Sequence, residues 1–395
     1  ADYSMDDDGD YFTWTRAEMQ AVLTEDEAAV AGLHYDVNEV GEMHHNPEKN
    51  VLYVRASLEE IGKRLGLTAE RAQALLESAR QKMYAARLKR PTPYVDKTVY
   101  VGWNSLCVSA YLEAAKVLQL EGARHSALRA LDRILADAWR PEQGLQHVVA
   151  YSDPAAEPRP VPGLLDDYAF TAVACLDAYE ATADLSYFIF AQGVVDKMVD
   201  RFFDPVAGGF FDTAASGSEK SLGVLGTPRK PFQDSPTPAG NSVAAIALLR
   251  LFAFTGQQSY REKAEQTLDL AAGLSGKFGI FAATYGIAAV HFSRPHTQVV
   301  VVGDDDLAKQ LYAVAASFFA LQNTVLKLAA NEVVGQNLPP ALAETIPNLP
   351  AIKSGKSVAV VCSGFSCQPP VIDPEQLKRS LSVALKSQEI NPSPE

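Results

Sequence analysis

The stretch Gly163-Leu164-Leu165-Asp166-Asp167-Tyr168-Ala169-Phe170 places two adjacent carboxylates at the start of a strongly apolar run. From Leu165 onward, apolar residues recur every three or four positions, at Tyr168, Ala172, Cys175, Leu176 and Tyr179. This spacing predicts a helix with one buried face. Asp166 and Asp167 then lie in its first turn, where free backbone N–H groups and the helix dipole favour negative charge. Stabilisation of the helix start is therefore one explanation for both residues. The alternative is that one carboxylate faces a cleft and transfers protons.

Three predicted helix pairs share one format in the middle of the chain. They are Gly102 to Leu120 with Arg124 to Trp139, Leu164 to Ala183 with Leu185 to Phe202, and Asn241 to Phe254 with Ser259 to Ala272. The last two pairs share a turn, in which Tyr187 and Tyr260 each stand five residues after a Thr and four before an Ala. This self-similarity predicts a repeated helical hairpin.

Helix signals also precede these pairs, and strand signals follow them. Thr15, Ser57 with Glu60, and Thr68 are typical helix starts. Beyond about residue 290, the sequence predicts strands at 297–302, 324–328 and 357–362, with helices at 306–321 and 374–385. We therefore expect a mainly helical domain over residues 1–290 and a small α/β module over residues 291–395.

The composition limits the classes of function. The chain has 395 residues, 47% hydrophobic and 21% charged, which is typical of a soluble globular protein of the cytoplasm or an organelle. Its net charge of −13 argues against nucleic acid or an anionic membrane surface as partner. No stretch is long and apolar enough to predict a membrane span. Four cysteines are too few for a disulfide scaffold, which favours a reducing compartment.

Several motifs, in the same order, carry a resemblance to a known family. They are Arg90-Pro91-Thr92-Pro93-Tyr94-Val95-Asp96-Lys97, Trp103-Asn104-Ser105, the Gly163 stretch, Gly208-Gly209-Phe210-Phe211-Asp212-Thr213, Arg229-Lys230, Asp234, Pro238-Ala239-Gly240-Asn241-Ser242 and Val361-Cys362-Ser363-Gly364-Phe365-Ser366-Cys367. Together they resemble the spermatogenesis-associated protein 20 family, whose bacterial members are described as thioredoxin-domain-containing proteins. The resemblance extends over nearly the whole chain.

This resemblance implies a thioredoxin-like domain followed by an (α/α)6 toroid similar to six-hairpin glycosidases and N-acylglucosamine 2-epimerases. The thioredoxin-like domain and the first hairpins are missing from this sequence, so we expect an incomplete toroid. Either the sequence is a fragment, or a complementary chain carries the missing parts. Val95-Asp96-Lys97 stands where Asp-Asp-Lys is usual, and Ser105 where Gly is usual. The resemblance supplies no established catalytic residues.

A toroid that acts on sugars needs a carboxylic acid, a base or nucleophile opposite it, and aromatic planes for the sugar faces. The candidate catalytic residues are Asp96, Asp166, Asp167 and Asp234, and the candidate substrate-binding residues are Tyr168, Lys97, Trp103, Asn104, Arg229 and Asn241. Each also has a structural explanation. Asp96 with Lys97 reads as a surface ion pair, Asn104 or Ser105 as a helix cap, and Gly240 as a tight turn.

The remaining chemistry is sparse. His147, His291 and His296 lie in predicted connections without evident partners, so no histidine pair for an epimerase is predicted. Cys362 and Cys367 fit a disulfide or half a metal site, and without a second ligand pair we predict neither metal nor cofactor. The leading hypothesis is sugar hydrolysis or isomerisation with a sugar or other small molecule as ligand. The alternative is a non-catalytic scaffold or interaction domain that serves a thioredoxin-like domain or partner chain.

Overall fold

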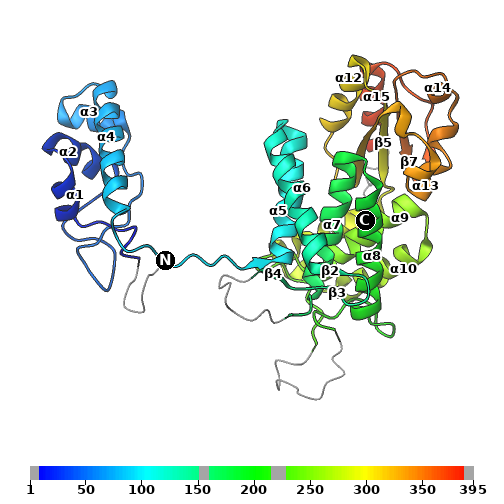
Figure 1. Cartoon of the computed structure of the whole chain (residues 1–395), viewed down its shortest axis with the longest axis horizontal. Helices are drawn as coiled ribbons and strands as arrows, with labels where there is room; N and C mark the ends of the chain where they lie inside the picture. The colour runs from blue at the N-terminus through cyan, green and yellow to red at the C-terminus, as the bar shows by residue number, and fades with distance from the viewer. Residues whose placement is uncertain (1–8, 151–159, 215–227, 387–395) are drawn as a thin grey trace, which may run out of the picture. The chain divides into compact units, whose positions relative to one another are not determined.

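The structure of the protein is a computed structural model that describes residues 9–150, 160–214 and 228–386 (Figure 1). The chain divides into two units, Ala1–Asp96 and Lys97–Glu395, and each is described by itself. The domain boundary predicted at about residue 290 lies where helices are followed by strands. That this point divides two domains stays a prediction.

The first unit consists of helices α1 (Arg16–Val22), α2 (Glu25–His34), α3 (Leu58–Leu65) and α4 (Ala69–Arg87). Its helix starts are those predicted from the sequence. Thr15 and Ser57 accept from the backbone N–H of Glu18 and Glu60, whose carboxylates accept from the cap residues in return. These reciprocal capping boxes satisfy backbone donors that a helix start leaves free. Trp14, Met19, Val30, Ile61 and Leu76 belong to the core of this unit.

The second unit contains the three predicted hairpins. They are α5 (Val101–Leu118) with α6 (Glu121–Ala138), α7 (Leu165–Thr182) with α8 (Leu185–Phe202), and α9 (Gly240–Thr255) with α10 (Gln258–Ala272). Helices α5, α7 and α9 contact one another in series, and each packs against its own outer partner. Consecutive hairpins with an inner and an outer layer form the wall of an α/α toroid. Helices α7 and α9 are buried on nearly every side, as expected for an inner layer.

The repeated turn has a clear structural role. The hydroxyl of Tyr187 at the start of α8 donates to Asp132 on α6, and the hydroxyl of Tyr260 at the start of α10 donates to Asp196 on α8, both at 2.7 Å. Each outer helix is therefore tied to the preceding outer helix by the same side chain. The predicted repeat of a helical hairpin is confirmed.

The C-terminal part forms a four-stranded sheet in the order β6 (Asn323–Leu328), β5 (Thr297–Val302), β7 (Val358–Ser363) and β8 (Ser366–Cys367). Strands β5 and β6 are parallel and joined through α12 (Asp306–Ala316), whereas β7 runs antiparallel to β5. The predicted end of α12 at about Leu321 is wrong. Residues 317–322 instead form the connection from α12 to β6. This strand begins at Asn323, which pairs with Thr297 at the start of the parallel register.

The sheet lies between two layers of helices. Val300, Leu326 and Val360 on one face share a core with the hairpin helices, and the short helix α13 (Pro340–Ala343) contacts α9. Val299 and Val361 on the other face pack with α12 and α15 (Pro374–Lys386). The mainly helical fold with a small α/β module is thereby confirmed, and a continuous core joins the two parts.

Short elements complete the second unit: β1 (Val99–Tyr100), β2 (Trp139–Arg140), β3 (Gly144–Leu145), β4 (Val148–Ala150), α11 (Ala283–Ser293), α13 (Pro340–Ala343), α14 (Pro350–Lys353), and 3-10 turns at Ser275–Lys277, Gly279–Ala282, Ala330–Glu332, Gly335–Asn337 and Ile346–Asn348. Strand β1 pairs with β4, and β2 with β3. None of the helices in the described ranges is long and apolar enough to cross a membrane.

Candidate functional site

The starts of the three inner helices meet at the Asp166-Asp167 pair. The backbone N–H of Gly102, in the first turn of α5, donates to Oδ1 of Asp167 at 2.8 Å. Gly240, the first residue of α9, lies so close to Asp166 that an added Cβ would stand 2.2 Å from Oδ1 of that carboxylate. Three helix ends, each with a positive dipole end, therefore surround two adjacent carboxylates.

The carboxylate of Asp167 is fully engaged. Besides Gly102, its donors are the backbone N–H of Leu164 and Nδ1 of His147, each at 2.8 Å from Oδ2. The side chain is 2% exposed. Asp167 thus caps its own helix, as the structural explanation of this residue predicts, and it also fixes the imidazole of His147.

His147 follows β3 and lies between a carboxylate and an aromatic ring. The hydrogen bond that His147 donates to Asp167 raises the pKa of His147, with burial opposing it. The imidazole is tilted against the ring of Tyr100, with 5.3 Å between centroids, and Tyr100 in turn contacts the ring of Trp103 at 4.9 Å. Trp103 is 61% exposed, so this aromatic row ends at the solvent.

Asp166 is in a different environment from its neighbour. It is half-buried, and no hydrogen bond or ion pair to its carboxylate is found among the described residues. Burial, followed by the negative charges of Asp167 and Asp212, raises the pKa of Asp166 to about 6, while His147 opposes the shift. Asp166 can therefore gain and lose a proton close to neutral pH.

Three of the residues predicted to bind substrate lie in the same unit. Each forms hydrogen bonds with nearby backbone groups, and one also bonds a neighbouring side chain. The hydroxyl of Tyr168 is buried and accepts from Leu145 N at 2.8 Å and from the guanidinium of Arg201. The amide of Asn241 bonds both N and O of Phe210. The amide nitrogen of Asn104 donates to Tyr100 O at 2.7 Å. These side chains shape the loops around the pair and do not meet Asp166.

The loop residues Arg229 and Asp234 also have structural partners. The backbone N–H of Arg229 donates to the carboxylate of Asp212, and the backbone N–H of Asp212 donates to the carbonyl of Arg229. The carboxylate of Asp234 accepts from Ala239 N and Thr284 N, which connects the segment preceding α9 to the first turn of α11. Asp96 and Lys97 are both exposed. Asp96 ends the first unit and so is not placed relative to this cluster, whereas Lys97 begins the second unit, to which the cluster belongs.

Two sequence-based interpretations are wrong. Neither Asn104 nor Ser105 caps α5, because the helix begins earlier, at Val101, and Ser105 donates to the carbonyl of Val101 within it. His147 does have a partner, Asp167, which lies 20 positions away in the sequence, and His296 has one in the hydroxyl of Thr324 at 2.9 Å. His291 lies within α11 and not in a connection. The sequence places His147 beside a Gly-rich aromatic loop, and that is the signal by which it could have been selected.

Two cavities are formed by described residues of the second unit. One, of about 200 Å³, is lined by Asn241, Ser242 and mainly apolar residues of α10. The other, of about 270 Å³, lies beside the disulfide between Cys362 and Cys367. No group of three His, Cys, Asp or Glu residues within the described ranges is arranged to hold a metal ion.

Known proteins are similar to nearly the whole chain. Over 95% of its length, it is 29% identical to spermatogenesis-associated protein 20 from Homo sapiens and 28% identical to the protein of that name from Mus musculus. The resemblance to the spermatogenesis-associated protein 20 family is confirmed. An uncharacterized protein from Caenorhabditis elegans is 23% identical over 92% of the chain. The human and mouse proteins are each covered to 49%, so the chain spans about half the length of the curated relatives it matches. No family model matches the chain.

Some solved structures are similar in part. A GH76 α-mannanase from Bacteroides thetaiotaomicron gives a TM-score of 0.41 at 17% identity, covering 51% of this chain and 54% of that one. A cellobiose 2-epimerase from Bacillus thermoamylovorans gives a TM-score of 0.36 at 14% identity, covering 46% of each chain. Both likenesses concern the fold alone.

Proposed function

We propose that the start of α7 is an acid–base site for a reducing sugar. The observation that carries the proposal is the contrast within the pair: Asp166 is half-buried with a pKa raised to about 6, whereas its neighbour Asp167 is engaged with His147. Two titratable groups, a carboxyl and an imidazole, are thereby held at one place in different environments. Enzymes use such differences to assign acid and base roles.

In this proposal each residue has one role. Asp166 is the general acid, because a pKa near the working pH favours proton transfer. His147 is the base, and Asp167 orients the imidazole and stabilises its charged form through the 2.8 Å hydrogen bond. The exposed ring of Trp103 provides a flat apolar surface beside them for one face of the sugar.

The engagement of Asp167 favours isomerisation or epimerisation over hydrolysis. A glycosidase of the usual kind needs two carboxyl groups that are free to act on the substrate or on water. Asp167 accepts from three donors and is 2% exposed, so it is not free to do so. One carboxylic acid and one imidazole suit proton transfer at the carbon beside a sugar carbonyl.

Hydrogen–deuterium exchange tests the proposal directly. The chain is incubated in deuterated water with aldoses, N-acyl amino sugars and reducing disaccharides, and NMR follows deuterium entry beside the carbonyl. We expect exchange with at least one class, and a loss of about 100-fold or more in Asp166→Asn and His147→Asn. Asn at position 147 keeps a donor toward Asp167, which protects the fold.

The matched control is Asp306→Asn, which changes an exposed first-turn aspartate of α12 that lies outside the cluster. It should exchange at the wild-type rate. If Asp166→Asn exchanges as fast as this control, the assigned acid is wrong. If wild-type protein binds no sugar and shows no exchange, the non-catalytic interaction domain becomes the better proposal.

A further inference from the structure

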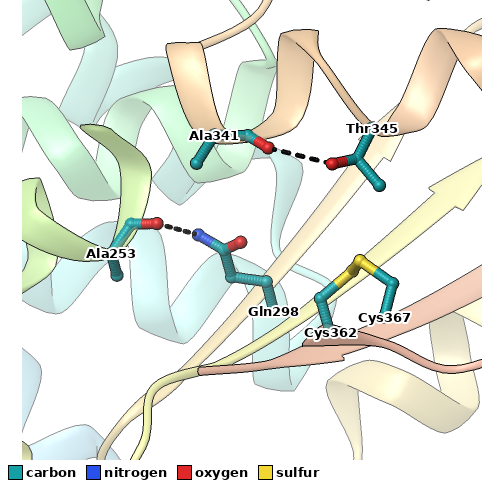
Figure 2. The surroundings of a disulfide bond; sticks show 6 residues. All are labelled: Ala253, Gln298, Ala341, Thr345, Cys362 and Cys367. Carbon is teal, nitrogen blue, oxygen red and sulfur yellow. Dashed lines mark hydrogen bonds between the residues drawn. A yellow bond between two sulfur atoms is a disulfide. The ribbon is translucent and has the colours of Figure 1, made fainter. Parts of the chain in front are cut away.

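The cavity of about 270 Å³ lies away from the Asp166 cluster, among α9, the end of α11 and the hairpin of β7 and β8. Gln298 of β5 lines it and donates to the carbonyl of Ala253 at 3.1 Å. Figure 2 shows this bond near the disulfide that joins Cys362 to Cys367. The cavity is slightly smaller than the roughly 300–1,000 Å³ typical of pockets for drug-sized ligands. Its size therefore suits a small molecule.

Two guanidinium groups line this cavity without an acidic partner. Neither Arg261 nor Arg294 has an ion pair with any carboxylate in the part of the chain that the structure describes, although the net charge is −13. The Nε of Arg294 is buried without a hydrogen-bond partner. Buried polar groups are almost always hydrogen-bonded, so an unsatisfied one calls for an explanation.

A third guanidinium, that of Arg250, acts on the cavity-lining His291 but is shared by two carboxylates. Asp177 and Glu180 of α7 each accept from Arg250 at 2.7 Å. The positive charge of Arg250, together with burial as the larger cause, lowers the pKa of His291 to about 4. Arg261 and Arg294, which have no such partners among the residues that the structure describes, therefore supply the positive charge at the cavity wall, and this favours an anionic ligand.

Aromatic side chains form the remaining walls. The guanidinium of Arg261 stacks over the ring of Phe292, 4.6 Å from its centroid. Phe365 contacts Phe252 edge-on at 5.2 Å. Gly364 and Phe365 both have positive φ, 54° and 66°, as the two-residue turn between β7 and β8 requires. This turn holds the ring of Phe365 at the cavity wall.

We infer that this cavity binds a small molecule in which an anionic group, carboxylate or phosphate, is joined to a flat apolar body. Arg261 and Arg294 hold the anionic oxygens, and the anion satisfies the free donor of Arg294. The rings of Phe292 and Phe365 enclose the flat body. This assignment is independent of the function proposed for the Asp166 cluster.

Calorimetric titration of the full chain with four probes tests the inference. The probes are phenyl phosphate, benzoate, inorganic phosphate and the uncharged benzamide. Phenyl phosphate or benzoate should bind about 10-fold or more tightly than benzamide, which reports the anionic group. Inorganic phosphate should bind more weakly than phenyl phosphate, which reports the flat body. Equal binding of benzamide and both anionic probes, or no binding of either anionic probe, would overturn the assignment.

Variants locate the site. Arg261→Gln with Arg294→Gln should weaken phenyl phosphate or benzoate about 10-fold or more, whereas Arg129→Gln, at an exposed position of α6, should leave the affinity unchanged. Circular dichroism and melting confirm that the double variant is folded. If it is not, NMR of wild-type protein decides: a bound anion raises the pKa of His291, and an unchanged pKa at saturating probe contradicts the assignment. Asp166→Asn should bind the probe normally, because its site is separate.

Discussion

Nδ1 of His147 and Oδ2 of Asp167 lie 2.8 Å apart, although the two residues are 20 positions apart in the sequence. The bond joins the connection after β3 to the first turn of α7. It also decides what each partner can do: the carboxylate is occupied, and the imidazole is fixed with its Nδ1 committed to Asp167.

Removing that carboxylate should change the titration of the imidazole. Asp167→Asn is expected to lower the pKa of His147, because the hydrogen bond to Asp167 is the largest cause of its raised value. The stability that this pair contributes is complete below the ordinary histidine pKa and is lost as the pH rises through the folded-state value. NMR titration of the His147 ring in both proteins measures the shift, and an unchanged pKa in Asp167→Asn would show that the bond is absent in solution.

Asp166 should lower the stability of the protein at neutral pH. Its pKa is raised from the ordinary 3.8 to about 6, so ionisation is unfavourable in the folded state and the cost grows as the pH rises through this interval. We expect Asp166→Asn to stabilise the fold by up to about 3 kcal/mol at pH 7.5, and by little near pH 4. Denaturant unfolding at both pH values measures the difference. Equal effects at the two pH values would contradict a raised pKa, and Asp306→Asn provides the baseline.

The close approach of α9 to α7 should not tolerate a methyl group. In Gly240→Ala the added carbon would stand 2.2 Å from Oδ1 of Asp166 and 3.0 Å from Cδ2 of Leu165. We expect a loss of about 1–3 kcal/mol, partly recovered when Asp166→Ala is added. Gly273→Ala is the matched control, since nothing lies within 4 Å of its added carbon. Full additivity of the two substitutions would mean that the contact does not form.

The helices and the sheet should unfold as one unit. Arg250 of α9 bonds Asp177 and Glu180 of α7, and Glu180 also accepts from Thr324 of β6 at 2.8 Å. Arg250→Met leaves buried carboxylates unpaired and should cost about 3–5 kcal/mol, whereas Arg133→Met breaks an exposed pair and should cost less than about 1 kcal/mol. Hydrogen exchange should show α7, α9 and β6 equally weakened by the first variant. Weakening of α9 alone would argue for separate units.

The disulfide should stabilise the hairpin at the cavity wall. It closes a short loop between residues five positions apart, for which the chain-entropy argument gives about 2 kcal/mol. The variant Cys362→Ser with Cys367→Ser should lose about this much and bind the anionic aromatic probe more weakly. Wild-type protein treated with a dithiol should behave in the same way, and the double variant should not respond to the dithiol. A response of the double variant would locate the effect elsewhere.

The sequence predicts local structure here far better than it predicts the site. The stripe that begins at Leu165 defines α7, and the turns at Tyr187 and Tyr260 reveal the hairpin repeat, because both depend on neighbours a few residues away. The end of α12 could not be foreseen, since it is set by pairing of Asn323 with a distant strand. The partnership of His147 with Asp167 is of the same kind: only the folded chain brings the loop after β3 to the start of α7.

The glycines at the helix starts affect how mutational surveys of this protein should be interpreted. A Cβ at Gly240 would stand 2.2 Å from Oδ1 of Asp166, which leaves no room for it, and one at Gly102 would stand 3.0 Å from Oδ1 of Asp167, which makes a tight contact. Intolerance to substitution there reports on packing, whatever the chemistry of the site. Asp166 offers the opposite pattern: if it serves catalysis, replacing it should preserve abundance and abolish activity. A scan scored for both properties would therefore separate the residues that build this site from those that use it.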